Sequence, residues 1–157
     1  HLVSVFAYLD ITITDESRIE HGFVLPCAGT SELDSSIIVI MVLDPEESTI
    51  IIHAVSSFAV PDDKMTSIVE LVNRINRLCG NQHLFVDSQS KKCAFLHGIR
   101  LENGLLPKEE FLNAFRGIIA NVLCWFPLLQ ELIMFGGVSS DLIRKRIPCY
   151  NDKTTIY

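Results

Sequence analysis

The alternation of apolar and polar residues along the chain predicts a set of strands in its first half. The segment Ser36–Leu43 is an almost unbroken apolar run, which is typical of a strand covered on both faces. The turn signal Asp44-Pro45-Glu46-Glu47 separates it from a second strand, Thr49–Val60, so the two should form a hairpin. A shorter strand, Glu20–Leu25, precedes them, and Pro26 is expected to end it.

A helix and a second hairpin follow. The helix should begin at Pro61-Asp62-Asp63, because acidic side chains favour a helix N-terminus, and end at Gly80-Asn81, where a left-handed cap fits. Its apolar positions recur at helical spacing. The strands His83–Val86 and Lys92–Leu101 are then joined across a short polar turn, which again predicts a hairpin.

A second long helix should begin at Pro107, which suits the first helical turn. Because proline lacks a backbone donor, Pro127 is expected to kink or break this helix near residue 126 and leave a second segment, Leu128–Phe135. Short helices are expected at Leu2–Leu9 and Ser140–Arg146. The order α-β-β-β-α-β-β-α predicts an α+β fold with a mainly antiparallel sheet of about five strands and helices packed on it. Residues 1–137 form a single domain in this interpretation, and residues 138–157 form a C-terminal helix and tail packed on it or extending from it.

Both faces of the predicted sheet carry apolar side chains. In Thr49–Val60 one face holds Ile50, Ile52, Ala54, Phe58 and Val60, and the other holds Ile51, His53 and Val55. Two long helices can cover only one face. The other needs the N-terminal helix, a second subunit or a bound client segment, and exposed apolar patches usually indicate interaction. Ile51, Val55 and Leu96 are therefore candidate residues of a partner or dimer surface.

Three further residues are candidates for that surface. Asn73 and Asn76 lie three apart in the first long helix, where asparagine is a poor helix former. Their amides are either exposed or bonded to a neighbouring strand or a partner. Trp125, beside Pro127, either fills the core or anchors an interface.

Composition limits the classes of function. The 157 residues are 48% hydrophobic with a net charge of -6, which fits one globular domain and argues against nucleic-acid binding by a basic surface. No apolar run reaches the length of a membrane span, and no signal-peptide pattern is present, so we expect no membrane insertion. The five cysteines form no CxxC pair, which predicts free thiols in a reducing, cytoplasmic compartment.

No catalytic or cofactor motif is recognisable. The sequence lacks a phosphate-binding glycine loop, a nucleophile elbow and an HExxH pair. Cys93 and His97 share a strand face but lie ~13 Å apart, too far to hold one metal. A cross-strand pairing of His53 with His97 or Cys93 stays open. We expect no enzymatic activity, no cofactor and no metal.

The chain resembles the YbjN-like family of bacterial sensory transduction regulators. The resemblance is carried by "LVNRINRLCGN" (Leu71–Asn81), "HLFVD" (His83–Asp87), "KCAFLHGIRLENGL" (Lys92–Leu105) and "PKEEFLNAFRGIIANVLCWFPLLQELI" (Pro107–Ile133), and it covers roughly residues 2–135. It implies a strongly twisted antiparallel sheet similar to that of type III secretion chaperones, often as a homodimer. No catalytic residue is implied.

Together these features predict a non-enzymatic protein-binding module, a regulator or chaperone-like adaptor in the bacterial cytosol. Two alternatives remain. One is a self-contained homodimeric structural protein, and the other is a small-ligand-binding domain with a pocket that the sequence does not reveal.

Overall fold

A computed structural model describes residues 18–19, 22–27, 37–44, 48–103, 105–137, 141 and 143, and the side chains considered below begin at residue 48. The elements, in chain order, are β1 (Arg18–Ile19), β2 (Gly22–Cys27), β3 (Ile37–Asp44), β4 (Thr49–Ala59), the 3-10 turn η2 (Asp62–Lys64), α2 (Met65–Asn76), β5 (His83–Val86), β6 (Lys92–Arg100) and α3 (Lys108–Phe135). The predicted α+β class is therefore correct, with an antiparallel sheet and two long helices. The predicted helix at residues 2–9 lies outside the described residues.

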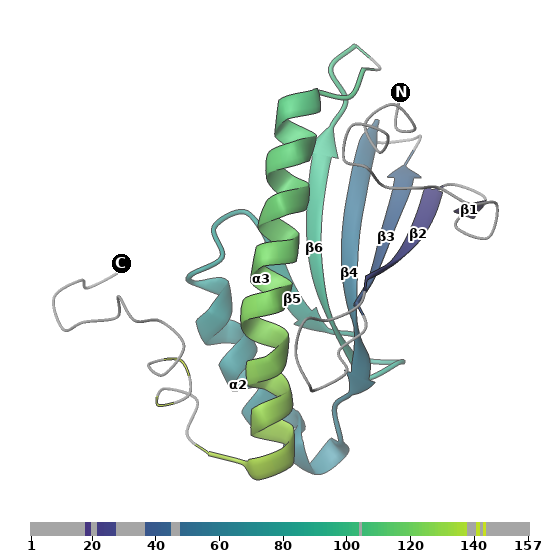
Figure 1. The fold of residues 1–157 in the computed structure, drawn as a ribbon. Coiled ribbons are helices and arrows are strands. Elements are labelled where there is room, and N and C mark those ends of the chain that lie inside the picture. The colour runs from purple at the N-terminus through teal and green to yellow at the C-terminus, as the bar shows by residue number, and fades with distance from the viewer. Residues whose placement is uncertain are drawn as a thin grey trace, which may run out of the picture.

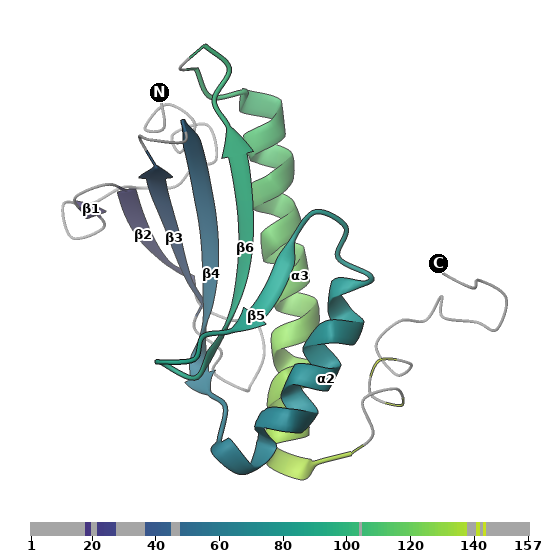
Figure 2. The ribbon, with the colours of Figure 1, turned by 180° about the vertical axis from the view of Figure 1, so that it is seen from behind.

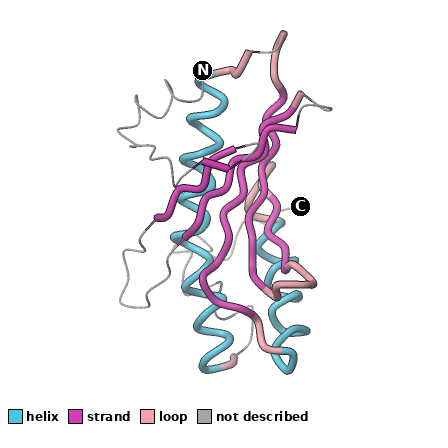
Figure 3. Tube along the Cα trace, turned by 90° about the vertical axis from the view of Figure 1, so that its right-hand side faces the viewer, coloured by secondary structure: helices cyan, strands magenta, loops and turns pink. Residues whose placement is uncertain are grey.

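The sheet contains both predicted hairpins. Its strand order is β1-β2-β3-β4-β6-β5, and every neighbouring pair is antiparallel. Three of these strands, β4, β6 and β5, have described side chains. Figure 3 shows the strands twisting past one another, as strands of L-residues do. The prediction of about five strands missed the two-residue strand β1.

The prediction that Pro26 ends its strand was wrong. β2 continues to Cys27, and Pro26 lies opposite Ile38 of β3. On the side of β2 away from β3, the described β1 pairs only with residues 22 and 23. Among the described residues, no hydrogen bond on that side therefore requires a backbone N–H from Pro26. Proline is tolerated in a strand at such a position.

Both helices pack on one face of the sheet. Figures 1 and 2 show α3 running along β6 and β4, with α2 beside it. One cluster of buried side chains joins this face to the helices, and its largest fully buried members are Phe95 of β6 and Phe111 and Phe126 of α3. Phe126 contacts Phe95 and Phe58 at ring-centroid distances of 5.8 Å each. Burying such a side chain stabilises the fold by roughly 1.5–3 kcal/mol.

A bulge near the end of β4 is closed by a serine. The register of β4 and β6 shifts between Val55 and Ala59. The buried Ser56 hydroxyl donates to the carbonyl of Phe58 (2.7 Å) and accepts from the backbone N–H of Cys93 (3.0 Å). This side chain thus replaces a missing ladder bond and lets Phe58 reach the core.

α3 is one continuous helix from Lys108 to Phe135 and contains Pro127 (Figure 1). The predicted break near residue 126 does not occur. Trp125, Phe126, Leu128 and Leu129, which flank the proline, are all buried, so packing holds the helix together across the lost hydrogen bond.

By length and composition alone, α3 could cross a membrane, since one stretch of 18 residues within it has a mean hydropathy of 1.8. The sequence argument considered only unbroken apolar runs and therefore missed it. In this fold the buried stripe of α3 belongs to the core of the domain, which gives the apolar composition a structural reason.

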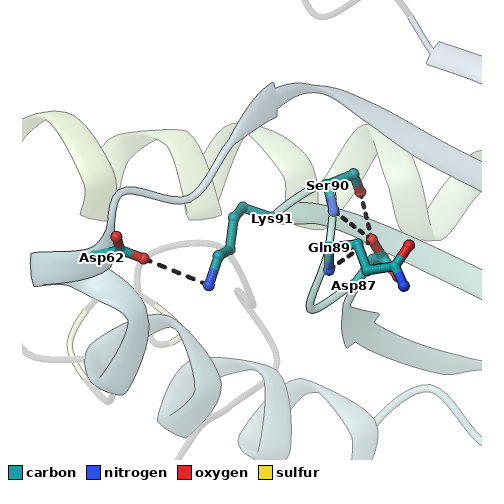
Figure 4. A network of polar contacts seen from close by, with 5 residues as sticks. All are labelled: Asp62, Asp87, Gln89, Ser90 and Lys91. Carbon is teal, nitrogen blue, oxygen red and sulfur yellow. Dashed lines mark hydrogen bonds and ion pairs between the residues drawn. The ribbon is translucent and has the colours of Figure 1, made fainter.

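The helix α2 ends earlier than the sequence predicts, at Asn76 rather than near Gly80. Gly80 does have a left-handed backbone (φ +60°), but it lies in the turn that follows. The acidic start of the helix carries no side-chain cap. Asp62 instead pairs with Lys91 at 3.4 Å (Figure 4).

The turn between β5 and β6 is organised by Asp87. Its Oδ1 accepts from the backbone N–H and hydroxyl of Ser90 (2.6 and 2.7 Å) and from the N–H of Gln89 (3.2 Å), as Figure 4 shows. These bonds, led by those from Ser90, lower the pKa of the Asp87 carboxyl. This exposed turn thereby fixes the connection predicted for the second hairpin.

Of the predicted C-terminal helix, the structure describes Asp141 and Ile143. Both have helical backbone, and Ile143 belongs to the core cluster. The basic residues 144–146 lie outside the described residues.

Candidate functional site

The face of the sheet opposite the helices is the candidate site. In β4 the buried residues Ile50, Ile52 and Ala54 alternate with the half-buried Ile51, His53 and Val55. In β6, Cys93, Phe95 and Ile99 belong to the core. The alternate residues of β6 therefore lie on the other face. The sequence analysis predicted this division of β4 and named Leu96 of β6 as a candidate for the outer face.

The strand register brings the predicted surface residues together. Val55 lies opposite Ala94, His53 opposite Leu96 and Ile51 opposite Gly98. On the next strand, Phe85 lies opposite Ala94 and is half-buried. The helix-free face, as we call it, therefore presents Ile51, Val55, Leu96 and Phe85 together with two histidines, His53 and His83, which lie on either side of Leu96. None of the buried helix residues packs on it, because they join the opposite face.

Charge on the described part of this face is found at the two ends of β6. Lys92 and Arg100 share the face with Ala94 and Leu96, since they lie at even spacing along the strand. Burial lowers the pKa of His53, so its imidazole is neutral at neutral pH. The described part of the face is thus mainly apolar, with Arg100 at one end of β6 and Lys92 beside the ionised Asp87 at the other.

Asn76 is not part of that face. Its amide donates to the carbonyl of Leu84 (2.9 Å) and accepts from the N–H of Leu84 (2.8 Å). This confirms one of the two predicted roles, bonding to a neighbouring strand. Asn73 is exposed on α2, in the helix layer.

Trp125 is also separate from the helix-free face. It is 5% exposed within the core, and its Nε1 donates to Asn121 Oδ1 (3.2 Å). The core-filling alternative is therefore the correct one for this residue. Of the six predicted surface residues, the structure brings together Ile51, Val55 and Leu96 and places the other three on the helix side.

A polar groove on the helix side was not predicted. It has a volume of about 790 Å³ and is open to solvent. Three elements line it: the turn after α2, β6 and the first turns of α3, with Cys79, Asn81, Gln82, His97, Glu110 and Asn113 among the lining residues. These residues are spread over 35 positions of sequence with no common motif, so only the fold brings them together.

Hydrogen bonds of the Gln82 side chain hold one side of this groove in place. The buried Gln82 donates through Nε2 to the carbonyl of Ala114 (3.3 Å) and accepts from Asn121 Nδ2 (2.6 Å). Gly117 leaves room for this amide, because a Cβ there would lie 2.6 Å from Gln82 Nε2. In contrast, His97 Nδ1 is buried without a partner.

His53 and His97 do not form a metal site with each other. His53 and His97 lie on opposite faces of the sheet, because His97 pairs with Ile52 and His53 pairs with Leu96. The open alternative of a pairing between them is therefore wrong. Within the described ranges, no three His, Cys, Asp or Glu side chains are grouped so as to hold a metal ion.

Comparisons with known proteins inform the fold. No protein-family model matches the chain, and no curated protein matches it. The crystal structure of YbjN from E. coli, described as a putative transcription regulator, is similar, with a TM-score of 0.61 and 15% sequence identity over 83% of this chain and 87% of that chain. At this identity the similarity shows a YbjN-like fold and nothing about function. It supports the fold implied by the resemblance, while membership of the family stays a prediction.

Proposed function

We propose that this chain is a non-enzymatic protein-binding module, a regulator or adaptor that binds an apolar segment of another protein on its helix-free face. The observation that carries the proposal is the row of apolar side chains that the register places there, Ile51, Val55, Leu96 and Phe85. Apolar surface of this kind is stabilised when it is removed from water. The YbjN-like fold adds support, because the similar protein is described as a regulator.

The first test is a comparative pull-down from lysate of the organism that encodes the protein. The tagged wild-type chain should retain one stoichiometric partner, identified by mass spectrometry. The double variant Ile51→Asp/Val55→Asp should lose it, because two carboxylates would have to be desolvated in the interface. Partner capture that survives the double variant would contradict the proposal.

A matched control introduces the same two negative charges on a different surface of the protein. The double variant Thr66→Asp/Asn73→Asp places two carboxylates on exposed positions of α2 and should bind normally. If Ile51→Asp/Val55→Asp unfolds by circular dichroism, the variant Ile51→Thr/Val55→Thr replaces it, because threonine keeps the strand preference and removes part of the apolar surface. A homodimer that buries Ile51 and Val55, with no other protein bound, would favour the structural alternative.

The polar groove favours a second candidate, a small-ligand-binding domain. Its volume of about 790 Å³ is within the usual range for ligand sites, and several polar side chains converge on it. Protein-detected NMR against a library of small polar compounds tests this candidate. Shifts confined to Asn81, His97 and Asn113 would support a ligand site, and shifts confined to β4 would not.

A further inference from the structure

The edge of the sheet beside the helix-free face is closed to strand addition. β5 is the last strand on this side and has four residues. Both backbone groups of Leu84 bond to the side chain of Asn76, so they point away from β6 and already have partners. The backbone N–H of Gln82, just before the strand, bonds to the carbonyl of Cys79 (3.2 Å). An extended segment needs successive free backbone groups to add to an edge, and β5 does not offer them.

The helix-free face also lacks partners for an extended backbone. Its described part consists of apolar side chains with two histidines, the neutral His53 and the exposed His83, on either side of Leu96. A peptide lying flat on this surface in extended form would leave its N–H and C=O groups buried without hydrogen bonds, which is costly. A helix bonds its own backbone internally, so it can cover an apolar face without that cost.

Charge gives a second property of the occupant. Lys92 and Arg100 stand at the two ends of β6 on this face, in a chain whose net charge is -6. Asp87 lies near Lys92, and its carboxylate, which accepts hydrogen bonds from Ser90 and Gln89, stays ionised, so Arg100 marks the more cationic end. A second copy of the chain packed face to face so that β6 lies on β6 would bring cations against cations, whichever way the two strands run. Acidic residues at the ends of the occupant would instead complement both positions.

We propose that the occupant of the helix-free face is an amphipathic helix of a partner protein, with an apolar stripe flanked at both ends by acidic residues. This inference rests on the proposed function and specifies its partner. Seven residues of strand lie between Lys92 and Arg100, so their Cα atoms are about 26 Å apart, which corresponds to roughly 17 residues of helix between the two acidic groups.

The test uses three fluorescent peptides of the same apolar stripe and titrates them by anisotropy. One peptide has Glu at both flanks, one has Lys at both flanks, and one has Glu flanks with a proline in its middle. The Glu-flanked helix should bind the wild-type chain about ten-fold more tightly than the Lys-flanked one, since each partly exposed pair contributes a fraction of a kcal/mol and repulsion is removed. The proline peptide should bind weakly because it cannot form the helix.

The decisive experiment reverses the charge of the two cationic residues, Lys92 and Arg100. The double variant Lys92→Glu/Arg100→Glu should reverse the preference and bind the Lys-flanked peptide more tightly, and Lys64→Glu/Arg77→Glu, on the helix side, should not. If Lys92→Glu/Arg100→Glu still prefers the Glu-flanked peptide, the proposal of acidic flanks is wrong. If the proline peptide binds as tightly as the Glu-flanked peptide without proline, the proposal that the occupant is a helix is wrong. If no peptide binds while the pull-down partner still depends on Ile51 and Val55, this inference fails and the proposed function stands. If that dependence is also absent, both fail.

Discussion

Two asparagines of one helix show how differently identical residues act. Asn76 bonds to both backbone groups of Leu84, which is 1% exposed, whereas Asn73, one turn earlier, is exposed. Replacing Asn76 with Ala leaves a buried donor and a buried acceptor without partners, which should lower the free energy of unfolding by about 2 kcal/mol. Asn73→Ala should change it by less than about 0.5 kcal/mol. Urea unfolding of the two variants measures this, and equal effects would contradict the role assigned to Asn76.

The thiol of Cys93 makes stability depend on alkaline pH. Burial raises the pKa of this thiol from 9.0 to about 12. Because the folded pKa lies above the unfolded one, the contribution is complete below about pH 9 and is lost as pH rises towards 12. The wild type should therefore lose stability relative to Cys93→Ala above pH 9, by up to about 1.4 kcal/mol per pH unit. Urea unfolding of both proteins across this range tests it, and parallel pH curves would disprove it.

In the helix α3, side-chain packing outweighs the tendency of a proline to break a helix. Pro127 removes the bond to the carbonyl of Leu123, a residue that is 41% exposed, so water can satisfy that carbonyl. Pro127→Ala should regain about 3 kcal/mol of helix preference and lose about 1.6 kcal/mol of buried ring, a net stabilisation of about 1 kcal/mol. Thermal unfolding measures the difference.

The control for this prediction is the other proline of the same helix. Pro107 stands at the N-cap, where its backbone is already suited to proline (φ -66°). Pro107→Ala should therefore lower stability slightly, by about 0.4–1 kcal/mol, through the greater freedom of the unfolded chain. A loss of stability in Pro127→Ala would mean that ring packing outweighs the missing hydrogen bond.

The strands and their faces were the most predictable elements. The period-two pattern of β4 identified Ile51 and Val55 on one face, and the same pattern placed Leu96 beside them. Two features depended on contacts remote in sequence and could not be predicted. Ser56 closes a bulge against Cys93, and the polar groove joins His97 of β6 to residues of two other elements. A pattern read along one strand contains no information about such partners.

At the scale of the whole molecule, the two described helices, α2 and α3, cover one face of a broad sheet and not the other. The order of elements predicted this architecture, because two helices of this length can bury only one sheet face. What covers the second face was left open by the sequence. The closed edge at Asn76 and the cations at the ends of β6 narrow that choice, and both required the spatial arrangement of α2, β5 and β6.

The salt dependence of association should separate a partner from a second copy. A face-to-face dimer that stacks β6 on β6 would oppose the cations Lys92 and Arg100 of both chains, so screening by salt would strengthen such a dimer. Binding of an acid-flanked helix relies on attraction to the same cations, so salt would weaken it. We therefore expect sedimentation velocity to show no dimer through this face at low salt, while anisotropy shows peptide affinity falling as salt rises. A dimer that is tight at low salt and is abolished by Ile51→Asp/Val55→Asp would instead assign the face to self-association, because apolar burial would then outweigh the repulsion of the cations.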